Sequence, residues 1–218
     1  VRLMFADHYE PYWGKASDAV ATSRVDAWLE AWPRIAESHP DDSGRPAQWT
    51  FFYPEEEYRA DLLEGLAGLT RRGLGDVEVH LHHDGESEQA FLDRMTGFLT
   101  TLRGAHGLMH DWQGRPGFAF IHGNWALDNS RPDGRWCGLN NELTLLRQLG
   151  CYADFTMPSA PDPCQTSLVN AIYWAVDDPV RPKSHDTGPL VTPGATPPKD
   201  ALLCVQGPLT MRPHPRWR

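Results

Sequence analysis

The chain has 218 residues, of which 40% are hydrophobic and 22% charged, and its formal net charge is −9. This composition is ordinary for a globular protein that buries a substantial core, and the acidic balance excludes a nucleic-acid partner, which needs a basic stripe. No apolar stretch reaches the length of a bilayer crossing, so we also expect no membrane span.

Strand and helix signals alternate through the first 155 residues. Short apolar runs that end in polar residues predict strands, and apolar residues at i, i+3 and i+4 predict helices. The predicted strands cover residues 2–5, 48–53, 75–79, 117–121 and 152–157, and the predicted helices begin near 18, 54, 87 and 141. Such alternation builds a parallel sheet or barrel with helices outside, and the polar residues after each strand lie where barrel sites form.

The last third of the chain departs from this pattern. Two further strands are predicted near 171–176 and 202–205, separated by a proline-rich loop at about 177–200. A loop of this length is usually functional or mobile. We expect one domain over residues 1–218, with this loop as its irregular part.

The four cysteines, at positions 137, 151, 164 and 204, have no C-x-x-C spacing. We therefore expect free and mostly buried thiols in a reducing compartment. Nothing at the start of the chain resembles a secretory signal, because the first residues enter a predicted strand directly.

The most informative segment is E-V-H-L-H-H-D-G-E, which runs from Glu78 to Glu86. Side chains at i and i+2 of a strand point the same way, so His80 and His82 are expected on one face. Two neutral imidazoles held side by side form half of a zinc-like site, whereas the alternative is an exposed polar strand end. We predict a divalent metal here, with zinc favoured over cobalt or nickel.

The order of these segments resembles the polysaccharide deacetylase superfamily, which includes rhizobial NodB and carbohydrate esterase family 4. F-A-D-H at 5–8 stands where that family has T-F-D-D-G, W-T-F-F at 49–52 is similar to A-T-F-F, and D-V-E-V-H-L-H at 76–82 is similar to the strand before an H-x-x-x-H metal motif. More narrowly, FADHYEP, HLHHD, HGNWALDNS, CGLNNELTLLRQLGCYADFTMPSA and QGPL resemble the WalW-type branch, deacetylases associated with lipopolysaccharide and exopolysaccharide synthesis. The resemblance covers nearly the whole chain.

The resemblance implies an α/β fold, a distorted parallel (β/α) barrel of about seven strands. It implies a metal-dependent hydrolase of the bacterial cytoplasm, which removes an N-acetyl or N-formyl group from a sugar or glycan precursor for surface polysaccharide. The alternative is a non-catalytic relative that binds sugar or a partner protein. The family's final strand, L-H-T-H-G with a catalytic histidine, is not found before Arg218. Either the chain is cut short at its C-terminus, or the general acid comes from elsewhere.

Carried onto this chain, the resemblance assigns His8, His80 and His82 as metal ligands and Asp7 as general base. If Phe5 is aligned with the family's phenylalanine instead, Ala6 takes the position of the base and Asp7 becomes a ligand. The H-x-x-x-H spacing is met by His80 with Asp84, or by His82 with Glu86, with a carboxylate in place of one histidine.

Five further residues are expected near the substrate. His122, at the end of the fourth strand, could supply the missing proton or hold the substrate. His83 and Asp84 are expected beside the metal, as partners of its ligands, alternative ligands or substrate contacts. Asn124 and Trp125 are candidate sugar contacts, through hydrogen bonding and stacking.

Overall fold

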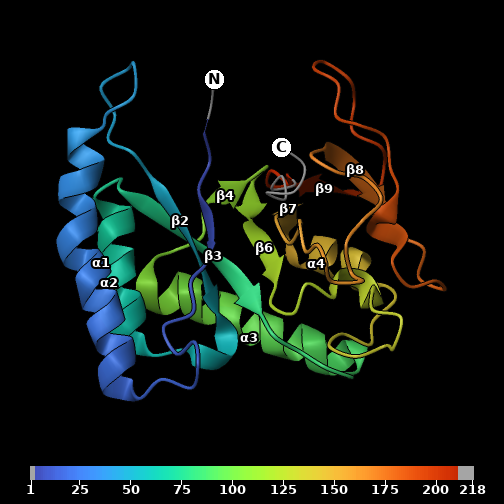
Figure 1. Ribbon diagram of the computed structural model, residues 1–218, viewed down its shortest axis with the longest axis horizontal. Helices are drawn as coiled ribbons and strands as arrows, with labels where there is room; N and C mark the ends of the chain where they lie inside the picture. The colour runs from blue at the N-terminus through green and yellow to red at the C-terminus, as the bar shows by residue number, and fades with distance from the viewer. Residues whose placement is uncertain (1–2, 211–218) are drawn as a thin grey trace, which may run out of the picture.

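The structure is a computed structural model in which residues 3–210 are described, and a single seven-stranded sheet forms its centre (Figure 1). The strand order is β1-β2-β3-β6-β7-β9-β8, and all neighbours run parallel except β8, which is antiparallel to β9. The strands are β1 Ala6–His8, β2 Trp49–Pro54, β3 Gly75–Leu81, β6 Phe118–His122, β7 Cys151–Asp154, β8 Ile172–Val176 and β9 Ala201–Val205. A separate hairpin pairs β4 Asp111–Trp112 with β5 Arg115–Pro116.

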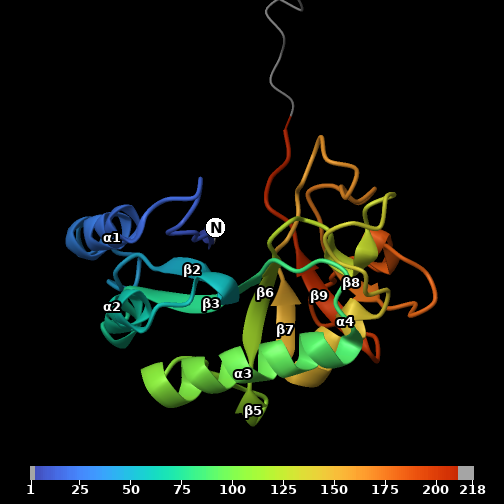
Figure 2. The same ribbon diagram turned by 90° about the horizontal axis from the view of Figure 1, so that it is seen from below.

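Four α-helices accompany this sheet within the described part of the chain. They are α1 Asp18–Ser38, α2 Ala60–Arg71, α3 Glu88–His106 and α4 Glu142–Leu149, with 3-10 turns η1 Glu55–Glu57, η2 Leu127–Asn129 and η3 Ser184–Asp186. The helices α1 and α2 pack together beside β2 and β3, whereas α3 and α4 lie together beside β6 and β7 (Figure 2). The sheet is strongly twisted, so β2 and β3 run in a different direction from β6 and β7 in that view.

Strand alternation divides the core between the two faces of the sheet. Phe51 belongs to the large cluster under the helices, whereas its neighbour Phe52 packs with Ala119 and Ile121 on the opposite face. We call these the helix face and the open face. The same alternation continues to the ends of β3 and β6, so only side chains that point to the same face of the sheet can contact one another there.

Local signals predicted helix starts better than the exact ends. Ser17 and Ser87 cap α1 and α3, each accepting a hydrogen bond from the backbone N–H three residues on. The helix predicted to begin near 54 is instead the 3-10 turn Glu55–Glu57, because Tyr58 has an extended ψ of 123° and α2 begins only at Ala60.

Three expectations for the sheet need correction or remain open. The first strand is Ala6–His8, whereas residues 3–5 of the predicted strand 2–5 are not in a strand and residue 2 lies outside the described residues. The last strand in the order, β8, is antiparallel. The mostly parallel α/β sheet is confirmed, but β1 and β8 end the strand order, so within residues 3–210 no pairing closes a barrel. The 177–200 loop contains η3 and one bridge from Leu190 to Tyr173.

Across residues 3–210, none of the helices combines the length and the apolar character that a bilayer crossing demands.

Candidate metal centre

Histidines from β1 and β3 meet on the open face of the sheet. His8 pairs in register with Phe52 of β2, and the next strand places His80 beside Pro54. The ring centroids of His8 and His80 lie 4.8 Å apart, and those of His80 and His82 are also 4.8 Å apart. His80 therefore lies between the other two predicted metal ligands.

A carboxylate that the sequence analysis did not select lies among these rings. Oε1 of Glu10 is 3.1 Å from Nε2 of His80, 3.7 Å from Nδ1 of His8 and 3.8 Å from Nε2 of His82. The donor atoms of His8, Glu10 and His80 all lie close enough together to hold one ion. We call His8, Glu10, His80 and His82 the rim cluster.

His80 in β3 and His82, one residue past its end, are each oriented by a partner at Nδ1. Nδ1 of His80 lies 3.1 Å from the Ile121 carbonyl, which can only accept, so this nitrogen carries the hydrogen. The neutral His80 ring then turns its Nε2 lone pair toward Glu10, and a cation or a proton is needed between the two acceptors. Nδ1 of His82 is hydrogen-bonded to Glu56, which leaves its Nε2 facing Glu10. Metal-bound histidines commonly have such partners at the other ring nitrogen.

The charges in the rim cluster are strongly coupled. Burial raises the pKa of Glu10, but contacts with His8 and His80 outweigh it and lower that pKa to about 2. Burial lowers the pKa of His80, whereas in His82 the contact with Glu56 outweighs burial and raises the pKa. Glu10 is thus ionised at neutral pH, as a metal-site carboxylate must be.

A cavity of about 420 Å³ opens beside the rim cluster. Its walls carry three tryptophans, one amide and members of the cluster: His8, Glu10, Trp13, His82, Gly123, Asn124, Trp125 and Trp136. The predicted sugar contacts Asn124 and Trp125 therefore share one cavity with two predicted metal ligands. Flat aromatic faces with a few polar groups suit a sugar ring.

The structure does not place Asp7 in this cavity. Strand alternation directs Asp7 away from His8, in register with Phe51 and against Trp49, and burial raises its pKa. The expected role of Asp7 as a base beside the metal is therefore not supported by its position. Its position also argues against the alternative alignment in which Asp7 is a ligand.

The two carboxylates offered by the H-x-x-x-H spacing also lie outside the rim cluster. Asp84 accepts a hydrogen bond from the backbone N–H of Trp136 at 2.6 Å, and Glu86 accepts one from Arg94 at 2.6 Å. Asp84 thus stabilises the loop that contains Trp136 and does not contact the rim cluster. The carboxylate that lies among the histidines is that of Glu10, not that of Asp84 or Glu86.

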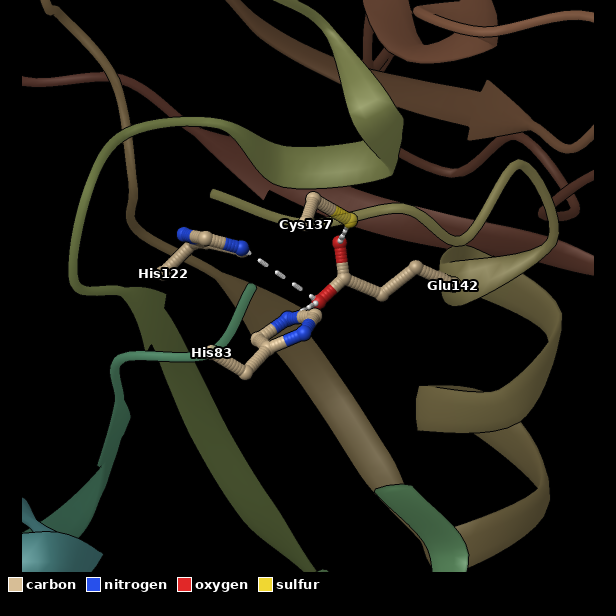
Figure 3. A group of neighbouring side chains, drawn as sticks. All are labelled: His83, His122, Cys137 and Glu142. Carbon is tan, nitrogen blue, oxygen red and sulfur yellow. Dashed lines mark hydrogen bonds and ion pairs between the residues drawn. The ribbon is translucent and has the colours of Figure 1, made fainter. Parts of the chain in front are cut away.

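A second group of donors lies on the helix face, buried beneath the loop that precedes α4 (Figure 3). Oε1 of Glu142 is 2.8 Å from Nε2 of His83 and 3.8 Å from Nε2 of His122, and its Oε2 is 3.3 Å from Sγ of Cys137. We call these four residues the buried cluster. Their donor atoms lie within 4.8 Å of one another, so this group could hold a metal ion.

The buried cluster corrects the expected placement of His83 and His122. His122 follows Ile121 in β6 and therefore points to the opposite face from His80, and it is fully buried. Burial lowers its pKa to about 3. Neither His122 nor His83 lines the cavity, so the expected proton donor and substrate contact both lie behind the sheet.

Three members of the two clusters were missed from the sequence. Glu10 follows His8 by two residues, Cys137 lies in a loop, and Glu142 is the first residue of α4. An acidic residue in the first turn of a helix is usually explained by its favourable interaction with the helix dipole. The sequence therefore gives no reason to select Glu142 as a metal ligand. The C-x-x-x-x-E spacing was the only local signal available.

Comparison of the chain with known protein families, with curated proteins and with solved structures finds no match.

Proposed function

We propose that the protein is a metal-dependent hydrolase that removes an N-acetyl or N-formyl group from a sugar or glycan precursor. The observation that carries the proposal is the rim cluster, with three imidazoles and a carboxylate at the wall of a tryptophan-lined cavity. The resemblance to polysaccharide deacetylases in the segments at 5–8, 49–52 and 76–82 supports the same reaction.

The donors of the rim cluster fit a catalytic divalent metal, with zinc as the first choice. His8, His80 and His82 would hold it, since three nitrogen ligands and an open position are the usual pattern of catalytic zinc. A metal bound there would supply an activated water and polarise the acyl carbonyl.

Glu10 is the carboxylate that we assign to the proton transfer. It is the side chain in contact with all three imidazoles, and it lines the cavity in which the substrate would lie. A carboxylate within hydrogen-bonding reach of the attacking water can accept its proton and deliver it to the leaving amine. Glu10 thus takes the role that the resemblance assigns to Asp7.

The cavity walls favour a sugar over an acyl peptide. Trp13, Trp125 and Trp136 offer flat apolar faces, and Asn124 adds a donor and an acceptor for hydroxyl groups. A pyranose ring presents the same combination of an apolar face and a polar edge.

The test combines metal content with turnover in the full chain purified without chelator. We expect His80→Ala to lose one equivalent of zinc relative to wild type and to release no acetate or formate from N-acyl sugars. His39→Ala is the matched control, because His39 is exposed at the end of α1, where it contacts the Ile35 carbonyl. Unchanged turnover or unchanged metal content in His80→Ala contradicts the proposal.

The same measurements separate the hydrolase from a non-catalytic relative. A rim cluster that takes up no zinc, cobalt or nickel on titration, in a protein that still binds N-acyl sugar, favours a sugar-binding module and contradicts the hydrolase.

A further inference from the structure

We propose that His83, His122, Cys137 and Glu142 form a second metal centre, a closed zinc site with a structural role. It fastens the segment 123–141 and α4 to the ends of β3 and β6. The inference is independent of the hydrolase proposal, because no member of the buried cluster belongs to the rim cluster.

The separations of the donor atoms are close to those of a tetrahedral zinc site. Zinc bonds of about 2.0–2.3 Å at tetrahedral angles place donors roughly 3.3–3.8 Å apart. Oε1 of Glu142 lies 2.8 Å from Nε2 of His83 and 3.8 Å from Nε2 of His122, and its Oε2 lies 3.3 Å from Sγ of Cys137. All the donor atoms lie within 4.8 Å of one another, so small shifts bring them to tetrahedral separations. Figure 3 shows the side chains of Cys137, His83 and His122 turned toward the Glu142 carboxylate from three sides.

Charge supports a divalent ion at this position. All four residues are buried, with His83 at 4% exposed and the other three at 0%. A thiolate and a carboxylate balance the charge of one zinc ion, and two neutral imidazoles complete four ligands. The buried assembly is then neutral, which avoids the large cost of an unpaired charge in the interior.

An unpartnered nitrogen is an independent sign of a missing ligand. Nε2 of His122 is buried, has no hydrogen-bond partner and faces Glu142. Buried polar atoms are normally paired, so each such nitrogen needs an explanation. A zinc ion at Nε2 of His122 moves the ring hydrogen to Nδ1, which breaks only the long 3.3 Å contact with the backbone N–H of Asn124.

The sulfur of Cys137 is placed to carry negative charge. It accepts hydrogen bonds from the backbone N–H groups of Asn129 at 3.3 Å and of Leu139 at 3.4 Å. Two amide donors stabilise a thiolate more than a thiol. Without a cation, the neighbouring Glu142 opposes that charge, and burial together with this carboxylate raises the pKa of Cys137.

The donor set and the closed surroundings point to structural zinc. Thiolate and imidazole ligands favour zinc over magnesium or calcium, which prefer oxygen. Four protein ligands leave no position for a substrate, unlike the rim cluster, which borders a cavity.

The segment that this centre would fasten has a strained backbone. Trp125, Asp128, Asn129 and Trp136 all have positive φ, between 51° and 70°. The left-handed region is sterically unfavourable for residues other than glycine, and most so for large side chains such as tryptophan. The same segment carries Asn124, Trp125 and Trp136 into the cavity, so a metal bond at Cys137 would hold the cavity wall in place.

Cobalt substitution tests the inference, because thiolate ligation of Co²⁺ gives a sulfur-to-cobalt charge-transfer band in the near ultraviolet. The full chain is stripped with chelator and titrated with Co²⁺. We expect two equivalents to bind and one of them to produce the band. His80→Ala should bind one equivalent and keep the band, whereas Cys137→Ser should bind one equivalent without it.

Cys151→Ser is the matched control, since Cys151 is also a buried thiol but lies in β7 outside the buried cluster. A band that survives in Cys137→Ser, or a folded wild type that shows no band with excess Co²⁺, overturns the inference. If Cys137→Ser does not fold, the wild-type spectrum alone decides between these outcomes. A wild type that binds only the equivalent with the band, so that His80→Ala changes nothing, would instead count against the hydrolase proposal alone.

Discussion

Glu10 is the residue on which the rim cluster converges, because its Oε1 lies within 3.8 Å of all three imidazoles. If it accepts the proton of the attacking water, Glu10→Gln keeps zinc and lowers kcat by about 10²- to 10⁴-fold, the usual contribution of a general base. Metal analysis and steady-state release of acetate or formate measure the two effects. Asp7→Asn should leave kcat unchanged, and the opposite pattern would restore Asp7 as the base.

Glu56 is the residue that orients His82, through a hydrogen bond to Nδ1. Removing such a partner typically weakens metal binding by about 10- to 100-fold. We expect that loss in Glu56→Gln, measured by competition with a chromophoric chelator. Glu55→Gln is the neighbouring control, since Glu55 pairs with Arg94 instead. Equal affinities in the two variants would contradict a positioning role for Glu56.

Single residues show where sequence reasoning succeeds and where it fails. The two-residue period of a strand placed His80 and His82 together, and that prediction is confirmed. The same period separates neighbours in sequence, and it directs Asp7 away from His8 and His122 away from Ile121. Glu10 reaches its cluster through the turn of the chain after β1, and Glu142 through the turn that leads into α4. Such turns have no periodic pattern in the sequence.

At the scale of elements, the rim cluster depends on how closely the ends of β3 and β6 approach. Gly123, directly after β6, lies against the ring of His82, and an added Cβ would collide with that ring. Gly123→Ala should therefore displace His82 and weaken zinc binding at the rim cluster, although it removes no ligand.

Calorimetric titration of the metal-free protein with zinc measures this effect. We expect at least a 10-fold weaker rim equivalent in Gly123→Ala, comparable with the loss of an orienting partner. Gly97→Ala is the control, because Gly97 in α3 has open space around its missing Cβ. Wild-type affinity in Gly123→Ala would show that His82 adjusts without cost, or that it is not a ligand.

Element types were more predictable than element pairings. The capping serines at 17 and 87 led to observed helices, and the apolar runs after residue 48 led to observed strands. The antiparallel direction of β8 depends on pairing with β9 across the 177–200 loop, which no local pattern records. The shift of the first strand from 2–5 to Ala6–His8 likewise reflects its pairing with β2.

At the scale of the whole molecule, a buried carboxylate should couple stability to pH. Asp154 in β7 is buried and accepts hydrogen bonds from the backbone N–H and the hydroxyl of Thr156. Burial raises its pKa to about 7, from 3.8 in an unfolded chain. Between these values the folded state holds a proton that the unfolded state has released, so the free energy of unfolding falls as pH rises.

Asp154→Asn removes this dependence. Relative to wild type, the variant should gain up to about 1.4 kcal/mol in the free energy of unfolding for each pH unit within that window. Urea unfolding of both proteins at pH 5 and pH 7 measures the change, and effects of the histidines cancel in the comparison. A difference between the two proteins that does not vary with pH would show that Asp154 is ionised in the fold.

The general architecture followed from the sequence, because regular alternation of strands and helices leaves few topologies apart from a mostly parallel sheet. Whether that sheet closes is a property of the whole chain, since it depends on the partners of the edge strands β1 and β8. The division of the candidate metal ligands into two clusters is also a whole-molecule property, because it requires both faces of the sheet and the folded 123–141 segment.

The most direct measurement is anomalous diffraction from crystals of the zinc-loaded protein, recorded above and below the zinc absorption edge. We predict an anomalous peak between Nδ1 of His8 and the Nε2 atoms of His80 and His82, beside Glu10. Crystals that contain zinc but show no peak among these three imidazoles would contradict the assignment of the rim cluster as a metal centre.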